Sequence, residues 1–177
     1  MLKLRELERR DMSTINAWRS QASLIRLLGA PYRFIGPEID ETWFDSYLSA
    51  RGNTVRCVTV DDSEDVPLCL STLSGIDWVN RSCIFSIMVG EDANRGKGIG
   101  TFSVNAMLDH AFDDLNLNRV ELGVLEGNAR ARHVYEKCGF RIEGLKREAT
   151  FKCGRYEDML VMAVLRSEWK TLGKPSV

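Results

Sequence analysis

The sequence predicts an α/β (α+β) fold: a mixed central sheet of about seven strands flanked by about four helices. Short stretches in which apolar residues alternate or cluster indicate strands. In four longer stretches the apolar residues recur at helical spacing, which indicates helices. One helical stretch, ending near residue 115, joins strand 81–89 to strand 119–125. A helix between two strands is the usual connection between parallel neighbours, so the sheet is expected to be mixed.

The N-terminal third is expected to hold one strand and two helices. Alternating leucines in "LKLRELE" predict the strand. A first helix is expected to begin at Asp11 as N-cap and to run through Ile15, Trp18, Ala22 and Ile25. The glycines and prolines of "GAPYRFIGP" predict a loop. A second helix is expected to follow, with Asp40 as its N-cap.

The remaining two thirds alternate strands and helices. The predicted strands cover residues 54–60, 67–75, 81–89, 119–125, 140–151 and 156–165. The two remaining helices are a stretch from the glycine loop at 90–100 to about residue 115 and a stretch over 128–138. We therefore expect one domain over residues 1–170 and a short C-terminal tail over 171–177.

Composition excludes several classes of protein. Hydrophobic residues make up 44% of the 177 residues, which is typical of a globular domain. No apolar run approaches the ~20 residues that a membrane-spanning helix needs. The charged N-terminus is not a secretory signal. Twenty-four basic and 25 acidic residues nearly balance, so charge alone predicts no nucleic-acid binding. Five scattered cysteines without a CxxC pair indicate a reducing, cytoplasmic setting, and two histidines predict no multi-histidine metal site.

The stretch "GEDANRGKGIG" over residues 90–100 has the composition of a phosphate-binding loop. Five residues rather than four separate Gly90 from Gly96, and Gly98 replaces the metal-binding hydroxyl, so the stretch does not fit a Walker loop. The third glycine also comes one residue early for a dinucleotide fingerprint. A cradle of backbone N–H groups before a helix would suit a diphosphate that is bound but not cleaved. The alternative is a glycine-rich hairpin turn.

A second motif favours the cradle. "RGKGIG" is followed at a regular interval by "NARARHVYEKCGF", in which Asn128, Ala131, Tyr135, Lys137 and Gly139 stand at defined positions. Together the two motifs resemble the GCN5-related N-acetyltransferase (GNAT) family, and the resemblance extends over most of the chain. The ends of the chain are similar to the branch containing ribosomal-protein N-terminal acetyltransferases and spermidine N-acetyltransferases.

The resemblance implies acetyl-CoA as co-substrate and a GNAT acyl-CoA N-acyltransferase fold. Backbone N–H groups from Arg95 to Gly100 would bind the coenzyme diphosphate, and strand 81–89, splayed from its neighbour, would pair with the pantetheine arm. Lys97 could equally be present for solubility rather than for binding the diphosphate. Asn128 is also a good helix N-cap, which would explain it without a coenzyme contact. The implied coenzyme-binding residues are Met88, Val89, Arg95, Gly96, Lys97, Gly98, Ile99, Gly100 and Asn128.

Two residues are candidates for proton transfer. Tyr135 falls on the buried stripe of its helix, which a core tyrosine would explain, but the resemblance implies that its hydroxyl protonates the departing thiolate. Relatives carry a glutamate on the strand before the loop, and "RSCIFSIMV" has none. Glu121 is the best replacement as base. The alternatives are a strand-surface charge at Glu121, a water relay, or an amine that is already partly neutral.

The resemblance implies acetyl transfer to a primary amine by direct attack in a ternary complex. The acceptor is left open between a protein N-terminus, a polyamine and an amino-sugar nucleotide. Acidic residues 38–45 would attract a cationic amine, although helix-start electrostatics explain them better. The alternative from another class is a non-catalytic acyl-CoA-binding sensor or regulatory module. Homodimers are common among relatives, and the sequence leaves the oligomeric state open.

Overall fold

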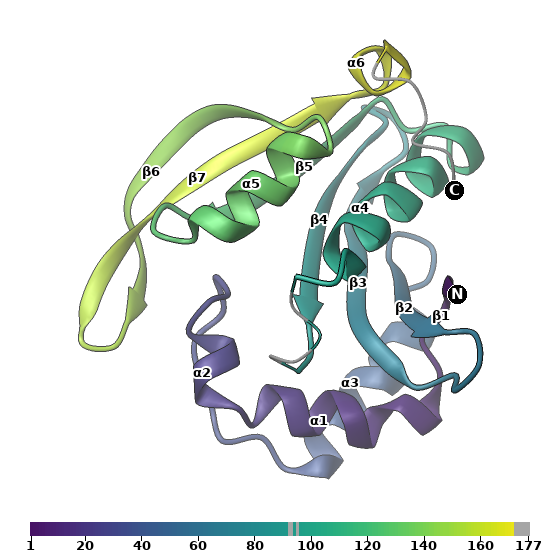
Figure 1. Ribbon diagram of the computed structural model, residues 1–177, viewed down its shortest axis with the longest axis vertical. Helices are drawn as coiled ribbons and strands as arrows, with labels where there is room; N and C mark the ends of the chain where they lie inside the picture. Colours follow the sequence, from purple (N-terminus) through teal and green to yellow (C-terminus); the bar gives the residue numbers. More distant parts are fainter. Residues whose placement is uncertain (92–93, 95, 172–177) are drawn as a thin grey trace.

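A single mixed sheet forms the centre of the computed structural model, which describes residues 1–91, 94 and 96–171 (Figure 1). Its seven strands lie in the order β1-β2-β3-β4-β5-β7-β6, and only the β4–β5 pair is parallel. The predicted mixed sheet of seven strands is therefore confirmed. The strands are β1 (Leu2–Glu6), β2 (Val55–Asp61), β3 (Pro67–Asp77), β4 (Ser82–Val89), β5 (Arg119–Leu125), β6 (Arg141–Lys152) and β7 (Arg155–Leu165).

The described residues form six α-helices, of which four correspond to the predicted ones. The two additional helices, α2 and α6, are four and six residues long. A 3₁₀ turn precedes α1, and a π-helical turn over His110–Asp114 extends α4. The helices are α1 (Met12–Arg19), α2 (Ala22–Ile25), α3 (Pro37–Ser49), α4 (Ile99–Asp109), α5 (Ala129–Lys137) and α6 (Arg166–Thr171).

The single helix expected from Asp11 to Ile25 is wrong, because the chain breaks between α1 and α2. Gln21 has extended backbone angles (φ −86°, ψ 103°) and starts the second helix. Apolar spacing could not reveal this break, because residues of both helices belong to one buried cluster. Asp11 precedes α1, but its carboxylate does not cap α1. It accepts hydrogen bonds from the Glu8 N–H and from Arg5.

Asp40 is not the N-cap of α3, which corrects the second helix start. The helix begins at Pro37, with Gly36 before it, so Asp40 lies in the first turn and is fully buried. Proline at the first helical position costs no hydrogen bond and already has a helical φ, which explains the earlier start. The Asp40 carboxylate instead accepts a hydrogen bond from Asn16 Nδ2 (2.7 Å) and pairs with Arg19 of α1.

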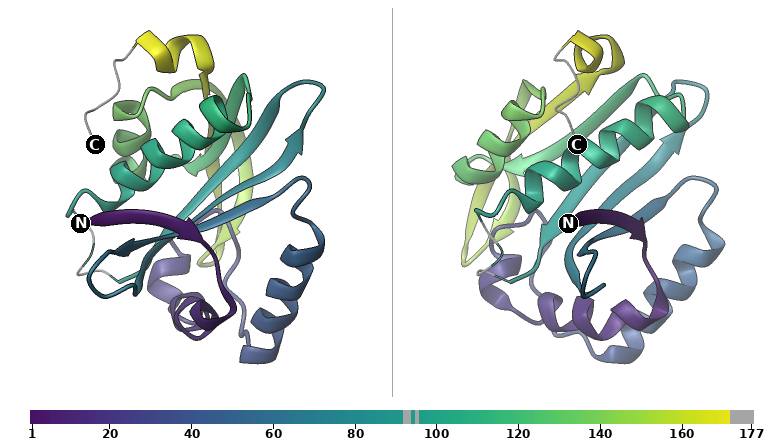
Figure 2. Two further views of the ribbon diagram at one scale, coloured as in Figure 1. Left: turned by 90° about the vertical axis from the view of Figure 1, so that its right-hand side faces the viewer. Right: turned by 45° about the vertical axis from the view of Figure 1, so that its right-hand side comes forward.

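The sheet separates two hydrophobic cores. Figures 1 and 2 show α4 and α5 on one side of the sheet and α1 and α3 on the other. The first core joins the sheet to Val104, Met107 and Leu108 of α4 and to Tyr135 of α5, whereas the second includes Met88. Because side chains of a strand alternate between faces, neighbouring residues of β4 contribute to different cores.

Within the described residues, no helix is both long and apolar enough to cross a membrane.

The cysteines behave largely as core residues. Cys57, Cys69, Cys83 and Cys138 are buried free thiols, whereas Cys153 is exposed at the turn between β6 and β7.

Candidate active site

Strands β4 and β5 separate partway along the sheet, which is the splay that the family resemblance implies. They pair only from Ser82 to Ile84 of β4 and from Arg119 to Glu121 of β5. Each strand continues on its outer side: β4 stays paired with β3 as far as Val89, and β5 with β7 as far as Leu125. Beyond Ile84 the facing edges of the two strands diverge (Figure 1). Backbone groups along these edges can pair with an extended, peptide-like ligand.

The glycine loop ends at the N-terminus of α4, beside the C-terminal end of β4. Gly96 (φ +85°) and Gly98 (φ +81°) have left-handed backbone angles, which favour glycine. Gly98 is the N-cap and no side chain caps the helix. The first-turn N–H groups of α4 therefore have no intrahelical partner, and the positive end of the helix dipole lies with them. This geometry fits the predicted diphosphate cradle at Gly96, Gly98, Ile99 and Gly100.

Gly90 and Gly100 have other surroundings. A Cβ on Gly90 would stand 2.2 Å from Cε2 of Trp18, so the Trp18 ring requires glycine there. A Cβ on Gly100 would meet only Val89 Cγ2, at an ordinary 3.8 Å. Packing within the protein thus explains Gly90 but not Gly100.

Two described cations, Lys97 and Arg130, lie in the same region. Arg95, predicted to bind the diphosphate, lies outside the described residues. Lys97 is exposed beside the glycines. On α5, a guanidinium nitrogen of Arg130 lies 3.4 Å from the point where a Cβ on Gly96 would stand. The fold therefore brings Arg130 to the glycine loop.

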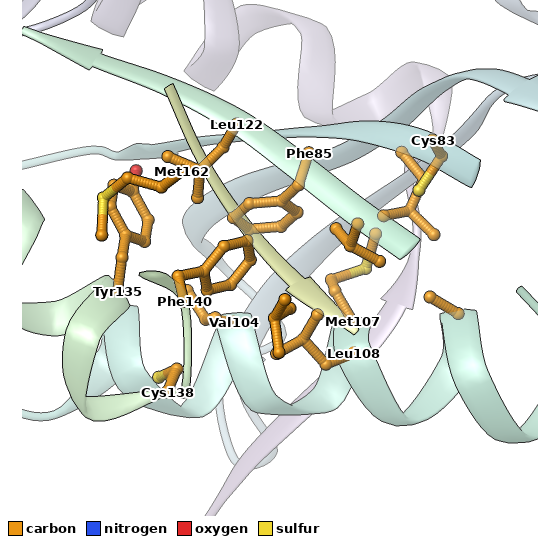
Figure 3. Packing of buried hydrophobic residues seen from close by; sticks show 14 of the residues in the cluster. Cys83, Phe85, Val104, Met107, Leu108, Leu122, Tyr135, Cys138, Phe140 and Met162 are labelled. Atoms are coloured by element: carbon orange, nitrogen blue, oxygen red, sulfur yellow. The ribbon is translucent and has the colours of Figure 1, made fainter. Parts of the chain in front are cut away.

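Tyr135 is buried, as its position on the apolar stripe predicts. Its ring points from α5 toward the strands (Figure 3) and lies 5.8 Å from the Phe140 ring, which lies 6.5 Å from that of Phe85. Phe85 is the first residue of β4 beyond the pairing with β5. The Tyr135 hydroxyl forms no hydrogen bond with any described residue, and burial raises the Tyr135 pKa well above 10.0. The hydroxyl therefore has no partner among the described residues, and the Tyr135 ring belongs to an aromatic cluster that extends to Phe85, where the splay begins.

Asn128 is the N-cap of α5, as predicted. Its Oδ1 accepts a hydrogen bond from the Ala131 N–H (3.1 Å). Its Nδ2 donates to the carbonyl of Leu27 (3.0 Å), in the segment after α2. The sequence carried no signal for this second contact, because the partners are 101 residues apart.

Glu121 points to the face opposite Val120 and Leu122, as alternation predicts: both neighbours are buried and Glu121 is half-buried. It stands opposite Ile84 at the last paired position before the splay. One of its oxygens accepts a hydrogen bond from Arg119 (2.8 Å), which also binds Glu143. Glu121 is thus held in an exposed ion-pair network, on the sheet face away from α5.

Met88 and Val89 lie at the C-terminal end of β4, on opposite faces. The Met88 side chain is buried in the core with α1 and α3, whereas Val89 faces Gly100 of α4. Their backbone pairs with Leu70 and Cys69 of β3. Only the β5-facing edge of this backbone is therefore placed to meet a ligand.

Three of the four acidic residues of α3 are paired with arginines. Asp40 pairs with Arg19, and Glu41 and Asp45 both pair with Arg9. Among the residues that the structure describes, no group of three or more His, Cys, Asp or Glu side chains is placed to hold a metal ion.

Known proteins share this fold over nearly the whole chain. A crystal structure of spermidine N-acetyltransferase from Vibrio cholerae, in complex with CoA and spermine, superposes with a TM-score of 0.89 at 30% identity and covers 96% of this chain and 98% of that one. Spermidine N(1)-acetyltransferase of Vibrio cholerae is 32% identical over 169 residues, 95% of both chains. The putative ribosomal N-acetyltransferase YdaF of Bacillus subtilis is 33% identical over 107 residues, 60% of this chain and 58% of that protein.

Residues 1–141 match the family described as acetyltransferase (GNAT) domain. This match covers both the glycine loop and the helix that carries Tyr135. It agrees with the splay between β4 and β5 and with the uncapped N-terminus of α4. The chain therefore belongs to the GNAT family and is an acetyl-CoA-dependent N-acetyltransferase.

Proposed function

We propose that this enzyme transfers the acetyl group directly to a primary amine in a ternary complex, with Tyr135 as the acid that protonates the departing thiolate. The observation that carries this proposal is the Tyr135 hydroxyl, which has no hydrogen-bond partner among the described residues, in an aromatic cluster that reaches Phe85 at the start of the splay. The diphosphate of acetyl-CoA would lie at Gly96–Gly100, and its pantetheine arm would pair with the free edge of β4. Backbone N–H groups of that edge would polarise the thioester carbonyl.

The chemical step needs one proton donor and one acceptor. The neutral amine attacks the thioester carbon, and collapse of the tetrahedral intermediate expels the coenzyme thiolate, which takes the Tyr135 proton. The Tyr135 hydroxyl is protonated at neutral pH, because a tyrosine pKa is ordinarily ~10 and burial raises that of Tyr135 further. No step requires an acyl-enzyme.

Tyr135→Phe tests the acid. The variant should lower kcat by about 10²-fold or more and leave acetyl-CoA affinity within twofold, because general acids contribute about that much. A loss of turnover in Tyr135→Phe, with acetyl-CoA binding intact in calorimetry, would support Tyr135 as the acid. Unchanged kcat in Tyr135→Phe would refute it.

We further propose Glu121 as the proton acceptor, acting through water. It faces the side of the sheet opposite Tyr135, so the amine and the leaving thiolate would approach opposite sides of the thioester. Glu121→Gln should lower kcat/KM at pH 7 by at least tenfold. The loss should shrink as the pH rises from 7 toward 9, because a growing fraction of a primary amine is then neutral.

Glu143→Gln is the matched control, because Glu143 shares the same Arg119 partner. A pH-independent loss, equal in the two variants, would show that Glu121 only stabilises the strand. A water relay without Glu121 would then be the better explanation.

Polyamines are the first acceptors to test, because relatives matching 95% of the chain are named spermidine N(1)-acetyltransferases. The likeness to YdaF makes ribosomal-protein N-terminal peptides the second class. Acetyl-CoA turnover should be compared with spermidine, spermine, an N-terminal peptide and an amino-sugar nucleotide. We place the reaction in a reducing, cytoplasmic compartment, which fits the four buried free thiols.

A further inference from the structure

The facing edges of β4 and β5 converge on the pair formed by Ile84 and Glu121, beyond which the strands are hydrogen-bonded to each other. With the coenzyme arm lying along β4, as proposed above, the arm runs from the glycine loop toward this closed end. The acyl group at the end of the arm must leave the plane of the sheet before it reaches the pair, because paired strands leave no gap between them. The room on each face of the sheet at this point then decides which acyl groups fit.

On the side of α4 and α5, buried side chains fill this room. Phe85 and Leu122 are the first residues of β4 and β5 beyond the last pair, and each is 2% exposed. They belong to the same core as Phe140 and Tyr135, and Figure 3 shows all four side chains on this side of the sheet. Because protein interiors are close-packed, a longer acyl chain cannot extend in this direction without displacing side chains.

The opposite face of the sheet is open at the same level. Two residues beyond the last pair, β4 carries Ser86 and β5 carries Gly123, and both are exposed. Alternation along the strands places them on the face of Glu121, toward α1 and α3. Small residues on both sides of the splay leave space here, so an acyl chain can extend on this face.

Met159 of β7 fills the part of this space that lies over β5. A Cβ on Gly123 would stand 2.7 Å from Met159 Sδ and 3.5 Å from Met159 Cγ, so the thioether lies directly over Gly123. The end of the side chain is fixed from the other direction, because a Cβ on Gly29 would stand 3.0 Å from Met159 Cε. Met159 is half-buried and stands opposite Leu125 of β5. Its side chain is therefore held between a glycine of the sheet and a glycine of the segment after α2.

We propose that Met159 is a specificity-determining residue that restricts the donor to acetyl-CoA. The Met159 thioether would border the acyl group on the face of α1 and α3 and occupy the volume that the third and fourth carbons of a longer acyl chain need. The restriction is steric. One additional methylene group in a filled apolar pocket changes discrimination between substrates by about 10–200-fold.

Calorimetric titration of the full chain with CoA, acetyl-CoA and butyryl-CoA tests this role without an amine. Wild type should bind butyryl-CoA at least about tenfold more weakly than acetyl-CoA, because its two additional methylene groups meet Met159. Met159→Ala should bring the affinities for the two thioesters within about threefold of each other, because the space over Gly123 is then open. Its affinity for CoA, which carries no acyl group, should stay at the wild-type value.

Met159→Leu is the matched control, because leucine has nearly the volume of methionine. It should keep the preference for acetyl-CoA. Met159→Val is a second shortened variant, in case alanine destabilises the sheet. Valine suits a strand and lacks the atoms that reach Gly123 and Gly29, so this variant should relax the preference as alanine does.

Equal affinity of wild type for the two thioesters would overturn the proposal. A preference for acetyl-CoA that persists in both shortened variants, or that is lost in Met159→Leu, would also overturn it. Proportional weakening of all three coenzymes would show that Met159 only supports the fold. Failure of the proposed function is distinguishable from these outcomes, because it would appear as unchanged kcat in Tyr135→Phe.

Discussion

Tyr135 meets a structural and a proposed chemical requirement together, whereas Asn128 meets two structural ones. Tyr135 fills the core between α5 and the sheet and still keeps an unbonded hydroxyl. Asn128 caps α5 with one amide atom and holds Leu27 with the other. Each pattern in the sequence was compatible with a structural explanation alone. For Tyr135 the hydroxyl without a described partner supports the proposed chemical role, whereas both amide atoms of Asn128 have partners within the protein.

Asp40 should be a stability residue rather than part of a polyamine site. Its buried carboxylate is shared by Asn16 and Arg19, so Asp40→Asn leaves a partly buried arginine without its charge partner. We expect a loss of about 3 kcal/mol in the free energy of unfolding, measured by urea denaturation. The exposed control Asp45→Asn should lose under about 1 kcal/mol. Equal effects would contradict this assignment.

The N-terminus of α4 combines two kinds of glycine. Gly98 needs its positive φ to start the helix, whereas Gly100 is helical and free of close neighbours. A side chain at 98 therefore strains the backbone. A side chain at 100 would matter only to a molecule approaching the helix end.

Gly98→Ala and Gly100→Ala should consequently differ. Gly98→Ala should lower the free energy of unfolding by about 1–2 kcal/mol, because alanine is strained at positive φ. Gly100→Ala should be as stable as wild type or slightly more so, because alanine favours helix. Both should weaken acetyl-CoA binding by at least tenfold in calorimetry. Wild-type affinity in Gly100→Ala would show that the diphosphate does not approach this turn.

Two cores on opposite faces of the sheet hold the protein together, and the buried thiols belong to both the sheet and α5. Burial raises the pKa of Cys57 and of Cys83 to about 12. It raises that of Cys69 and of Cys138 to about 11. A buried thiol disfavours its charged form, so these groups stay neutral in the folded protein well above pH 9.

Stability should therefore fall steeply at alkaline pH. Each thiol has a higher pKa in the folded protein than in the unfolded chain, where it is ~8.5. Its contribution to the free energy of unfolding is therefore complete below that unfolded pKa and is lost as the pH rises toward the folded pKa of 11–12. Each thiol should lower the free energy of unfolding by about 2 kcal/mol between pH 7 and pH 10. Urea denaturation across this range measures the slope, and Cys83→Ala should remove about one thiol's share. A flat profile from pH 7 to pH 10 would contradict the expectation.

Periodicity predicted the strands well, because each has a clear alternating or continuous apolar run. It failed at the start of α3 and at the break after α1. At those points Pro37 and Gln21 decide the backbone and apolar spacing does not change. The short α6 was missed, although Trp169 is buried in the core, because six residues carry too little periodicity. For the candidate site, the two motifs located the glycine loop, Asn128 and Tyr135.

The sequence by itself determined the mixed fold, the family and the glycines of the loop, because these depend on local spacing and on backbone angles that few residues adopt. Tertiary structure alone decided where β4 leaves β5, how Glu121 is paired, and that Arg130 lies beside Gly96. It also brought Lys152 and Asn128 onto segment 25–30. Those contacts join residues far apart in the chain, and no local pattern records which distant groups will satisfy a carbonyl or a charge.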